Sequence, residues 1–394
     1  MSASLKNYLK TEYLLLFLCA IEFLGRFNYI ILILFIFLLI KKSIKFQTGH
    51  NEMLVYIVLF SFFYFVFAGD TISFTDPFVW ICSYLIGVAL IKDKQSFLII
   101  LFILSLGTGL NGILVSVNSY IATGEIGIRQ MPDIWTGNLR GATSQSCAFL
   151  IFSGLLISIL SSPSIKKLIK FFSIVFLFCA IFNAIMSASR TALLYPIITI
   201  ILSWLLVINK KNIVRWLIIT FSITAIILFI YHSDFMSVKS FYEKQLLYER
   251  FTKVDEGNIL NNPRLSSWTF FSNNYDKYFW GGLSKNNPIL YMHNLILDTY
   301  AYAGILTTLL LVLIIVRSFI AALRIVWNTD YIERSYVLCV FVCFLLIFNT
   351  EPIIQASNWF FSLFLMYCGM IDSRRNKINL INNKSFYCKV NKIY

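Results

Sequence analysis

The sequence from Tyr291 to Gly304 joins a polar segment to a long apolar one and contains residues suited to acid–base chemistry. If a helix begins here, His293 stands in its first turn, and Gly304, eleven residues later, faces the same side. Histidine exchanges protons near neutral pH, so His293 could accept a proton from a reacting hydroxyl group, with Asn294 and Gly304 shaping and packing its helix. Asp298 lies about 140° round the helix from His293, so we expect it to pair with another helix or cap internal water. The alternative is a helix that merely begins with a histidine.

Three arginines beside apolar runs form a second candidate set. Arg190 and Arg140 each precede an apolar run, and Arg264 follows Pro263, which can start a helix. A guanidinium group is a rigid fork that binds two phosphate oxygens at once. Two or three of them converging at a membrane surface would suit a lipid pyrophosphate. The alternatives are interface anchors for Arg190 and Arg140 and a solvated loop side chain for Arg264.

The composition indicates a polytopic integral membrane protein. Of 394 residues, 58% are hydrophobic and 13% are charged, with a mean hydropathy of +0.76, whereas a soluble domain is nearer half apolar and a quarter charged. The net charge of +14 is therefore a topology signal first, and no nucleic-acid partner is expected. Seven of the eight cysteines fall in apolar runs, so neither a disulfide framework, a metal site nor a cofactor is expected.

We expect an all-α fold with about twelve transmembrane helices, because each span needs about 20 apolar residues. The expected spans are 11–25, 27–40, 52–69, 75–91, 96–121, 143–161, 168–187, 191–208, 213–231, 294–316, 335–350 and 357–372. With both termini in the cytoplasm, most of the 33 Lys and Arg residues fall in inner segments. His293, Arg140, Arg190 and Arg264 then lie on the outer side.

A single transmembrane domain with one long outer loop, residues 232–292 between the ninth and tenth spans, is the expected organisation. The loop is too rich in Trp, Tyr and Phe for a disordered linker, so we expect short helices at the interface or over a cavity. Long loops in compact proteins are usually functional. No internal repeat is evident, which argues against a secondary transporter.

The ordered set of candidate residues resembles the O-antigen polymerase and O-antigen ligase superfamily of bacterial envelope enzymes, closely over residues 140–316. The matching parts are Ser189–Leu193, Arg264 with Trp268, Gly281–Gly282, His293–Asn294, Leu297 and Gly304–Leu306. The sequence departs at Thr307, where ligases of this type often have a second glycine. We expect this difference to affect helix packing rather than chemistry.

The resemblance implies a metal-independent glycosyltransferase in the bacterial inner membrane, with its active site facing the periplasm. Its donor would be a glycan on undecaprenyl pyrophosphate, held by Arg190 and Arg264 and also by Arg140. His293 would take the proton from the acceptor hydroxyl as that oxygen attacks the anomeric carbon. A single displacement predicts inversion, and the aromatic outer loop would cover the site and stack on sugars.

A polymerase and a ligase differ only in acceptor, which is another lipid-linked repeat unit or the lipid A core. We favour polymerisation of O-antigen or capsule repeat units because such chains vary greatly and this one departs at Thr307. Membrane lipid and a chain-length regulator are further candidate partners. Two other classes stay open. A polysaccharide flippase would need no single long outer loop, and in a pore or structural membrane protein the His293 arrangement would be accidental.

Overall fold

The computed structural model describes residues 11–44, 48–124, 130–141, 167–186, 198–199, 201–202, 205–206, 263–283 and 291–390. These residues are mostly helical. Three of the described helices are long and apolar enough to cross a membrane, at Asn51–Thr71, Lys94–Thr123 and Leu295–Asn328. This agrees with the predicted class of protein.

Helices stand at nine of the twelve predicted span positions. The α-helices are α2 (Thr11–Ala20), α3 (Phe27–Ile40), α4 (Thr48–Ala68), α5 (Asp76–Leu90), α6 (Lys94–Thr123), α9 (Lys167–Met186), α14 (Pro263–Asn274), α15 (Leu295–Asn328), α16 (Tyr331–Phe348), α17 (Ile353–Ala356) and α18 (Asn358–Val390). Turns of 3₁₀ helix occupy Phe23–Gly25, Gly69–Thr71 and Tyr275–Tyr278. The predicted spans 143–161, 191–208 and 213–231 lie outside the described residues, apart from the pairs between 198 and 206. The count of twelve stays a prediction.

Two helices run well past their predicted ends. The predicted spans stopped at residues 316 and 372, where charged residues interrupt the apolar runs, but α15 continues to Asn328 and α18 to Val390. Neither extension contains the glycine or proline that would disfavour a helix. Charge ends a hydrophobic run without ending a helix.

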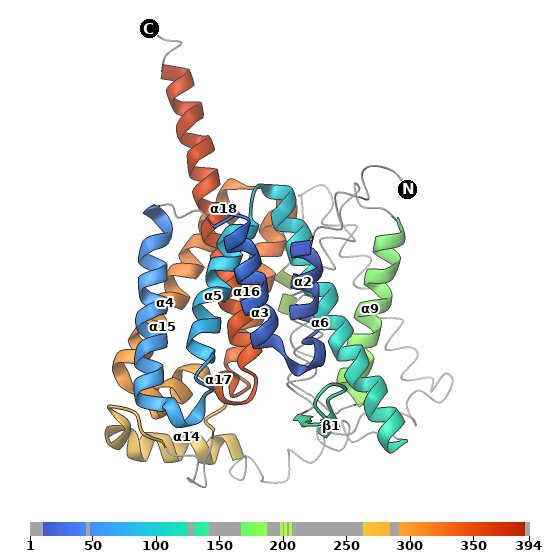
Figure 1. The fold of residues 1–394 in the computed structure, drawn as a ribbon, viewed down its shortest axis with the longest axis vertical. Helices are drawn as coiled ribbons and strands as arrows, with labels where there is room; N and C mark the ends of the chain where they lie inside the picture. The colour runs from blue at the N-terminus through green and yellow to red at the C-terminus, as the bar shows by residue number, and fades with distance from the viewer. Residues whose placement is uncertain are drawn as a thin grey trace. The chain divides into compact units, whose positions relative to one another are not determined.

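The chain divides into two compact units, residues 1–111 with 263–394 and residues 112–262. The first unit contains a bundle in which α18 packs along α5, and α15 packs along α4 and α16 (Figure 1). Rings from three helices form its aromatic centre, where Trp80 of α5, Phe60 of α4 and Phe361 of α18 all contact one another at centroid distances of 5.2 to 5.6 Å. Nothing in this division tests the predicted single transmembrane domain.

Helices α5 and α18 approach each other closely because glycine removes the side chain at their contact. A Cβ atom on Gly87 would lie 2.0 Å from the carbonyl oxygen of Met366, and one on Gly369 would lie 2.1 Å from that of Tyr84. Small residues that allow backbone contact are typical of packed membrane helices.

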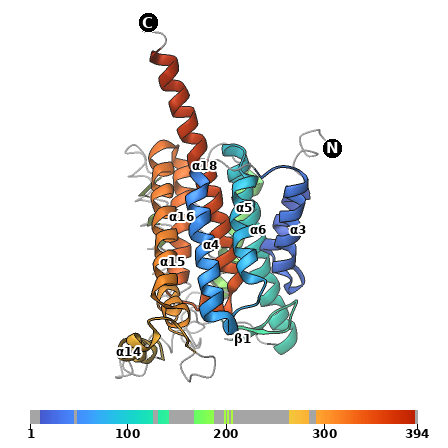
Figure 2. The ribbon, with the colours of Figure 1, turned by 60° about the vertical axis from the view of Figure 1, so that its left-hand side comes forward.

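The two ends of the first unit differ in character. At the lower end in Figures 1 and 2, the short helix α14 lies across the bundle near the start of α15. At the upper end, α18 extends beyond the other helices of the unit (Figures 1 and 2). The helix α14 begins at Pro263 within the long loop, as the sequence predicts.

The second unit contains a β-hairpin that the all-α prediction did not include. Strands β1 (Gln130–Pro132) and β2 (Leu139–Gly141) are antiparallel, with Met131 opposite Arg140. The side-chain amide of Asn118, from α6, donates to the carbonyl oxygen of Pro132 at 3.0 Å. Three-residue strands are too short to give an alternating sequence signal.

Candidate active site

Helix α15 begins at Leu295, whereas the sequence predicts a helix that already contains His293 in its first turn. Asn294 is the N-cap, and its Oδ1 accepts the backbone N–H groups of Ile296 and Leu297 at 3.0 and 3.1 Å. His293 therefore lies before the helix, in the left-handed region with φ +54°. The helical-wheel alignment of His293 with Gly304 was wrong, because one residue is outside the helix and the other interrupts it.

The buried carboxylate of Asp298 holds the backbone on both sides of His293. Its Oδ1 accepts the N–H of Met292 at 2.6 Å, and its Oδ2 accepts the N–H of Asn294 at 3.2 Å. A left-handed backbone costs a non-glycine residue about 1–2 kcal/mol, and these two hydrogen bonds offset that cost. The sequence led us to expect a partner on another helix or an internal water, whereas these two bonds join Asp298 to the backbone of its own segment. Asp298 positions the segment that carries the imidazole.

Helix α14 is attached to the same segment by its aromatic side chains. The indole Nε1–H of Trp268 donates to the carbonyl oxygen of Met292 at 2.7 Å. One turn later, the ring of Phe271 meets that of Tyr300 of α15 edge-on, with centroids 5.4 Å apart. The long loop that contains α14 is thus joined directly to the backbone that precedes His293.

Arg264 stands in the first turn of α14, four residues before Trp268. Residues four apart share one face of a helix and are separated by about 6 Å along its axis. The position of Arg264 is therefore one turn from the bond between Trp268 and the residue before His293. Its side chain lies outside what the structure describes.

A second helix end meets the His293 segment through two asparagines. The side-chain amide of Asn294 donates to Oδ1 of Asn349 at 2.8 Å, and Asn349 follows the last residue of α16. From the sequence we expected Asn294 to shape and pack the helix of His293. In the structure it caps α15 and links that helix to α16.

Helix α15 is interrupted at Gly304, which has φ +79° and ψ 178°. Residues 279–283, which we call the glycine loop, fill the interruption with backbone hydrogen bonds. Ile305 N–H donates to Phe279 O at 2.9 Å, Gly282 N–H to Tyr302 O at 3.0 Å, and Leu283 N–H to Ala301 O at 3.0 Å. A broken helix is tolerated at membrane depth only where its backbone groups find such partners.

Two threonines complete the hydrogen bonding around this break. Thr307 Oγ1 donates to Ala303 O at 2.8 Å, and Thr308 Oγ1 donates to Gly304 O at 2.9 Å. Thr307 is fully buried. The residue at which the sequence departs from the ligase pattern therefore satisfies a carbonyl group next to the interruption.

Arg140 belongs to the second unit, where its guanidinium forms a 2.5 Å ion pair with the buried carboxylate of Asp133. Oδ1 of Asp133 also accepts the N–H groups of Trp135 and Thr136, both at 2.8 Å, and so fixes the hairpin turn. Arg140 thus has a structural role in its own hairpin. Arg190 lies outside the described residues, and its predicted pyrophosphate contact stays a prediction, as does that of Arg140.

No family model matches this chain, and no curated protein matches it. Among the described residues, no group of three or more His, Cys, Asp and Glu side chains could hold a metal ion. The candidate site is therefore defined by its own residues and their geometry.

The structure adds three residues whose contacts the sequence did not predict. Asp298 holds the His293 segment, Trp268 attaches α14 to it, and Asn349 joins it to α16. Trp268 was part of the family resemblance, but its predicted role was among the sugar-stacking aromatics of the loop. An acid within an apolar run, five residues after a histidine, is the only sequence signal that pointed to Asp298.

Replacing Asp298 with asparagine is expected to loosen the His293 segment. Asparagine keeps one acceptor but turns an NH₂ group towards a backbone N–H, a loss of about 1–3 kcal/mol. Hydrogen exchange at residues 292–294 should rise. Asp276→Asn, which removes an exposed carboxylate from the turn Tyr275–Tyr278 after α14, is the matched control. Equal exchange in the two variants would contradict the proposed role of Asp298.

Proposed function

We propose that this protein is a membrane glycosyltransferase that moves a lipid-linked oligosaccharide from undecaprenyl pyrophosphate to an acceptor hydroxyl group. The observation that carries the proposal is the constrained setting of His293. Asp298 holds the backbone on both sides of the half-buried imidazole, and α14 brings the position of Arg264 to the same segment. Non-glycine residues in left-handed conformation gather at functional sites, where the surrounding structure enforces them.

The proposed reaction is a single displacement at the anomeric carbon. The acceptor oxygen forms the new glycosidic bond as the bond from that carbon to the pyrophosphate oxygen breaks. His293 takes the acceptor's proton, and the leaving pyrophosphate keeps the electron pair of the broken bond. Because pyrophosphate leaves as a stable anion, no general acid is required, and the configuration at the anomeric carbon inverts.

Arginine would bind the lipid pyrophosphate and stabilise the charge that develops as it leaves. Arg264 is the strongest candidate in the first unit, since α14 is attached to the backbone beside His293. Arg190 is a second candidate. Arg140 would have to bind pyrophosphate while it keeps, or after it exchanges, its bond to Asp133.

Exposed aromatic rings around the glycine loop fit a position at a membrane surface. Trp280, Tyr275, Phe279 and Trp268 are 64%, 58%, 45% and 43% exposed. Trp and Tyr are enriched at the membrane–water interface, and aromatic faces also stack on sugars. The donor combines a lipid tail with a glycan, so this end of the molecule suits both of its parts.

Polymerisation of repeat units on the periplasmic side is the form of this function that we favour. The test is to delete the gene in the source bacterium and to separate its lipopolysaccharide on a gel. Core bearing a single repeat unit is the expected result. If the deletion instead leaves bare core while lipid-linked polymer accumulates, the proposed reaction stands and its acceptor is the lipid A core. Single lipid-linked units trapped inside the cell would identify a flippase and overturn the proposal.

A further inference from the structure

A pocket of about 560 Å³ lies at the end of the bundle opposite His293, between α4, α15 and α18. Its lining combines three arginines, two asparagines, a glutamate and a tyrosine with three aliphatic side chains. Its charged side chains are those of Glu52, Arg317, Arg324 and Arg375. The pocket has no part in the function proposed above.

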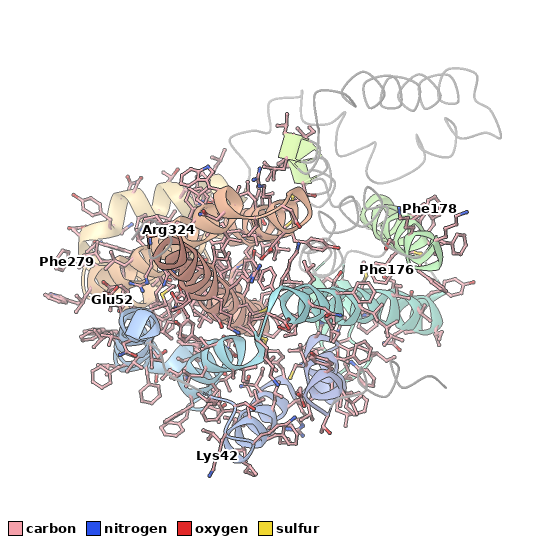
Figure 3. The ribbon with its side chains drawn as sticks, turned by 90° about the horizontal axis from the view of Figure 1, so that it is seen from above. Lys42, Glu52, Phe176, Phe178, Phe279 and Arg324 are labelled. Atoms are coloured by element: carbon pink, nitrogen blue, oxygen red, sulfur yellow. The ribbon has the colours of Figure 1, made fainter. Side chains whose placement is uncertain are left out.

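The arginines of this pocket differ in how their charge is balanced. Arg317 pairs with Glu52, and Arg375 pairs with Asp372 at 3.2 Å. Arg324 is exposed and has no ion-pair partner among the described residues. Figure 3 shows Arg324 and Glu52 on the same side of the fold, beside α18. The pocket thus presents one uncompensated positive charge beside two guanidinium groups that already bind carboxylate oxygens.

One wall of the pocket is apolar and faces outward. Leu313, Val316 and Ile320 follow each other at spacings of three and four residues, which puts them on one face of α15. Their side chains are 47%, 48% and 45% exposed, on a helix that is apolar enough to cross a membrane. A basic recess that continues into an exposed apolar strip fits a ligand with a charged head and a hydrocarbon tail.

The position of the pocket along α15 matches a lipid headgroup layer. From Leu295 to Arg317 the helix rises about 33 Å, and the hydrocarbon core of a bilayer is about 30 Å thick. With the His293 segment at one surface, Arg317 and Arg324 therefore reach the level of the phosphate groups at the other surface. The positive-inside pattern makes this the cytoplasmic surface.

We propose that this pocket binds a phosphate group, and that its position selects the headgroup of an anionic membrane lipid. Arg324 contributes its rigid fork to two phosphate oxygens, and Asn376 and Asn379 of α18 donate further hydrogen bonds. The acyl chains lie along Leu313, Val316 and Ile320. Basic pockets between helices on the cytoplasmic side are suited to such headgroups.

Binding can be measured by thermal unfolding of the purified full-length protein in neutral detergent. Phosphatidylglycerol, phosphatidylcholine and inorganic phosphate are added in separate titrations. Phosphatidylglycerol should raise the unfolding temperature of the wild type, and phosphatidylcholine should not. Arg324→Gln should bind phosphatidylglycerol about tenfold more weakly, which corresponds to about 1.4 kcal/mol. Arg324→Lys should lose less, because it keeps the charge.

Lys42→Gln is the control for a general loss of positive charge at this end. Asn28, near the start of α3, donates to Asp76 at the start of α5 at 2.7 Å. The two helices therefore start at one end of the bundle and finish at the other. Lys377 of α18 donates to Ile91 at the end of α5 at 2.6 Å. Lys42, just after α3, therefore lies at the pocket end but does not line the pocket.

The outcomes separate the sources of phosphate. If inorganic phosphate stabilises the wild type as well, and Arg324→Gln removes that effect, the pocket takes a phosphate group that a soluble ligand can also supply. If only phosphatidylglycerol acts, the ligand is the lipid. If the wild type, Arg324→Gln and Lys42→Gln respond equally to phosphatidylglycerol, the proposal is overturned.

Discussion

Replacing His293 with alanine is expected to abolish glycan transfer while the protein stays folded and inserted. Loss of a positioned general base lowers a rate by about 10²–10⁴-fold. Alanine removes the proton acceptor but leaves the bonds from Asp298 to Met292 N–H and Asn294 N–H, which involve only backbone at this segment. The measurement is transfer from a purified lipid-linked donor to acceptor in detergent, with unfolding temperature recorded in parallel.

Two further variants sharpen this test. His293→Gln keeps a polar side chain of similar size that cannot take up a proton at neutral pH, so it should be as inactive as alanine. His50→Ala removes a histidine from the first turn of α4, in the part of the chain that the sequence places at the inner side, and should transfer at the wild-type rate. Full activity in His293→Ala would eliminate the proposed mechanism.

The sequence predicted the helices of this protein better than it predicted the candidate site. Apolar runs such as 27–40 and 75–91 coincide with α3 and α5 to within a residue or so, because burial in a membrane or a core requires a continuous apolar surface. The late ends of α15 and α18 were missed because a charged residue interrupts hydropathy but not helical geometry.

Candidate residues for the site could be named from the sequence, but their arrangement in space could not. His293, Asn294 and Gly304 were assumed to belong to one regular helix, but α15 begins at Leu295 and is interrupted at Gly304. The N-cap at Asn294 and the carboxylate of Asp298 take His293 out of that helix. The glycine loop opens it at Gly304. Such contacts depend on tertiary structure, and they leave no periodic signal in a sequence.

The interruption at Gly304 leads to the second prediction, that Gly304→Ala disrupts the end of the bundle that carries the candidate site. The conformation at φ +79° and ψ 178° is essentially restricted to glycine and costs other residues about 1–3 kcal/mol. A Cβ atom would also lie 2.6 Å from the carbonyl carbon of Trp280 and 2.8 Å from the carbonyl oxygen of Phe279. Both are backbone atoms, so no side chain can turn away.

Relief of that clash requires the glycine loop to leave α15. The loop would then lose its three backbone hydrogen bonds to residues 301–305, each worth about 1 kcal/mol. Together with the cost of the backbone conformation at Gly304, we expect a total loss of about 4–6 kcal/mol and a marked fall in the unfolding temperature. Hydrogen exchange should rise at residues 279–283 and 301–305 together, since each set protects the other.

Gly282→Ala separates backbone strain from crowding, because Gly282 has φ +95° and a Cβ atom added there would meet no atom within 4 Å. It carries the cost of a positive φ alone, about 1–2 kcal/mol, and should leave α15 in contact with the loop. A larger loss of stability in Gly304→Ala than in Gly282→Ala would show that close backbone approach, rather than φ, holds this end together.

Glycan transfer should also fall in Gly304→Ala. The glycine loop is continuous in sequence with α14, and α14 is hydrogen-bonded to the segment that carries His293. Equal unfolding temperatures for Gly304→Ala and the wild type would mean that the broken helix and its loop are not coupled as described.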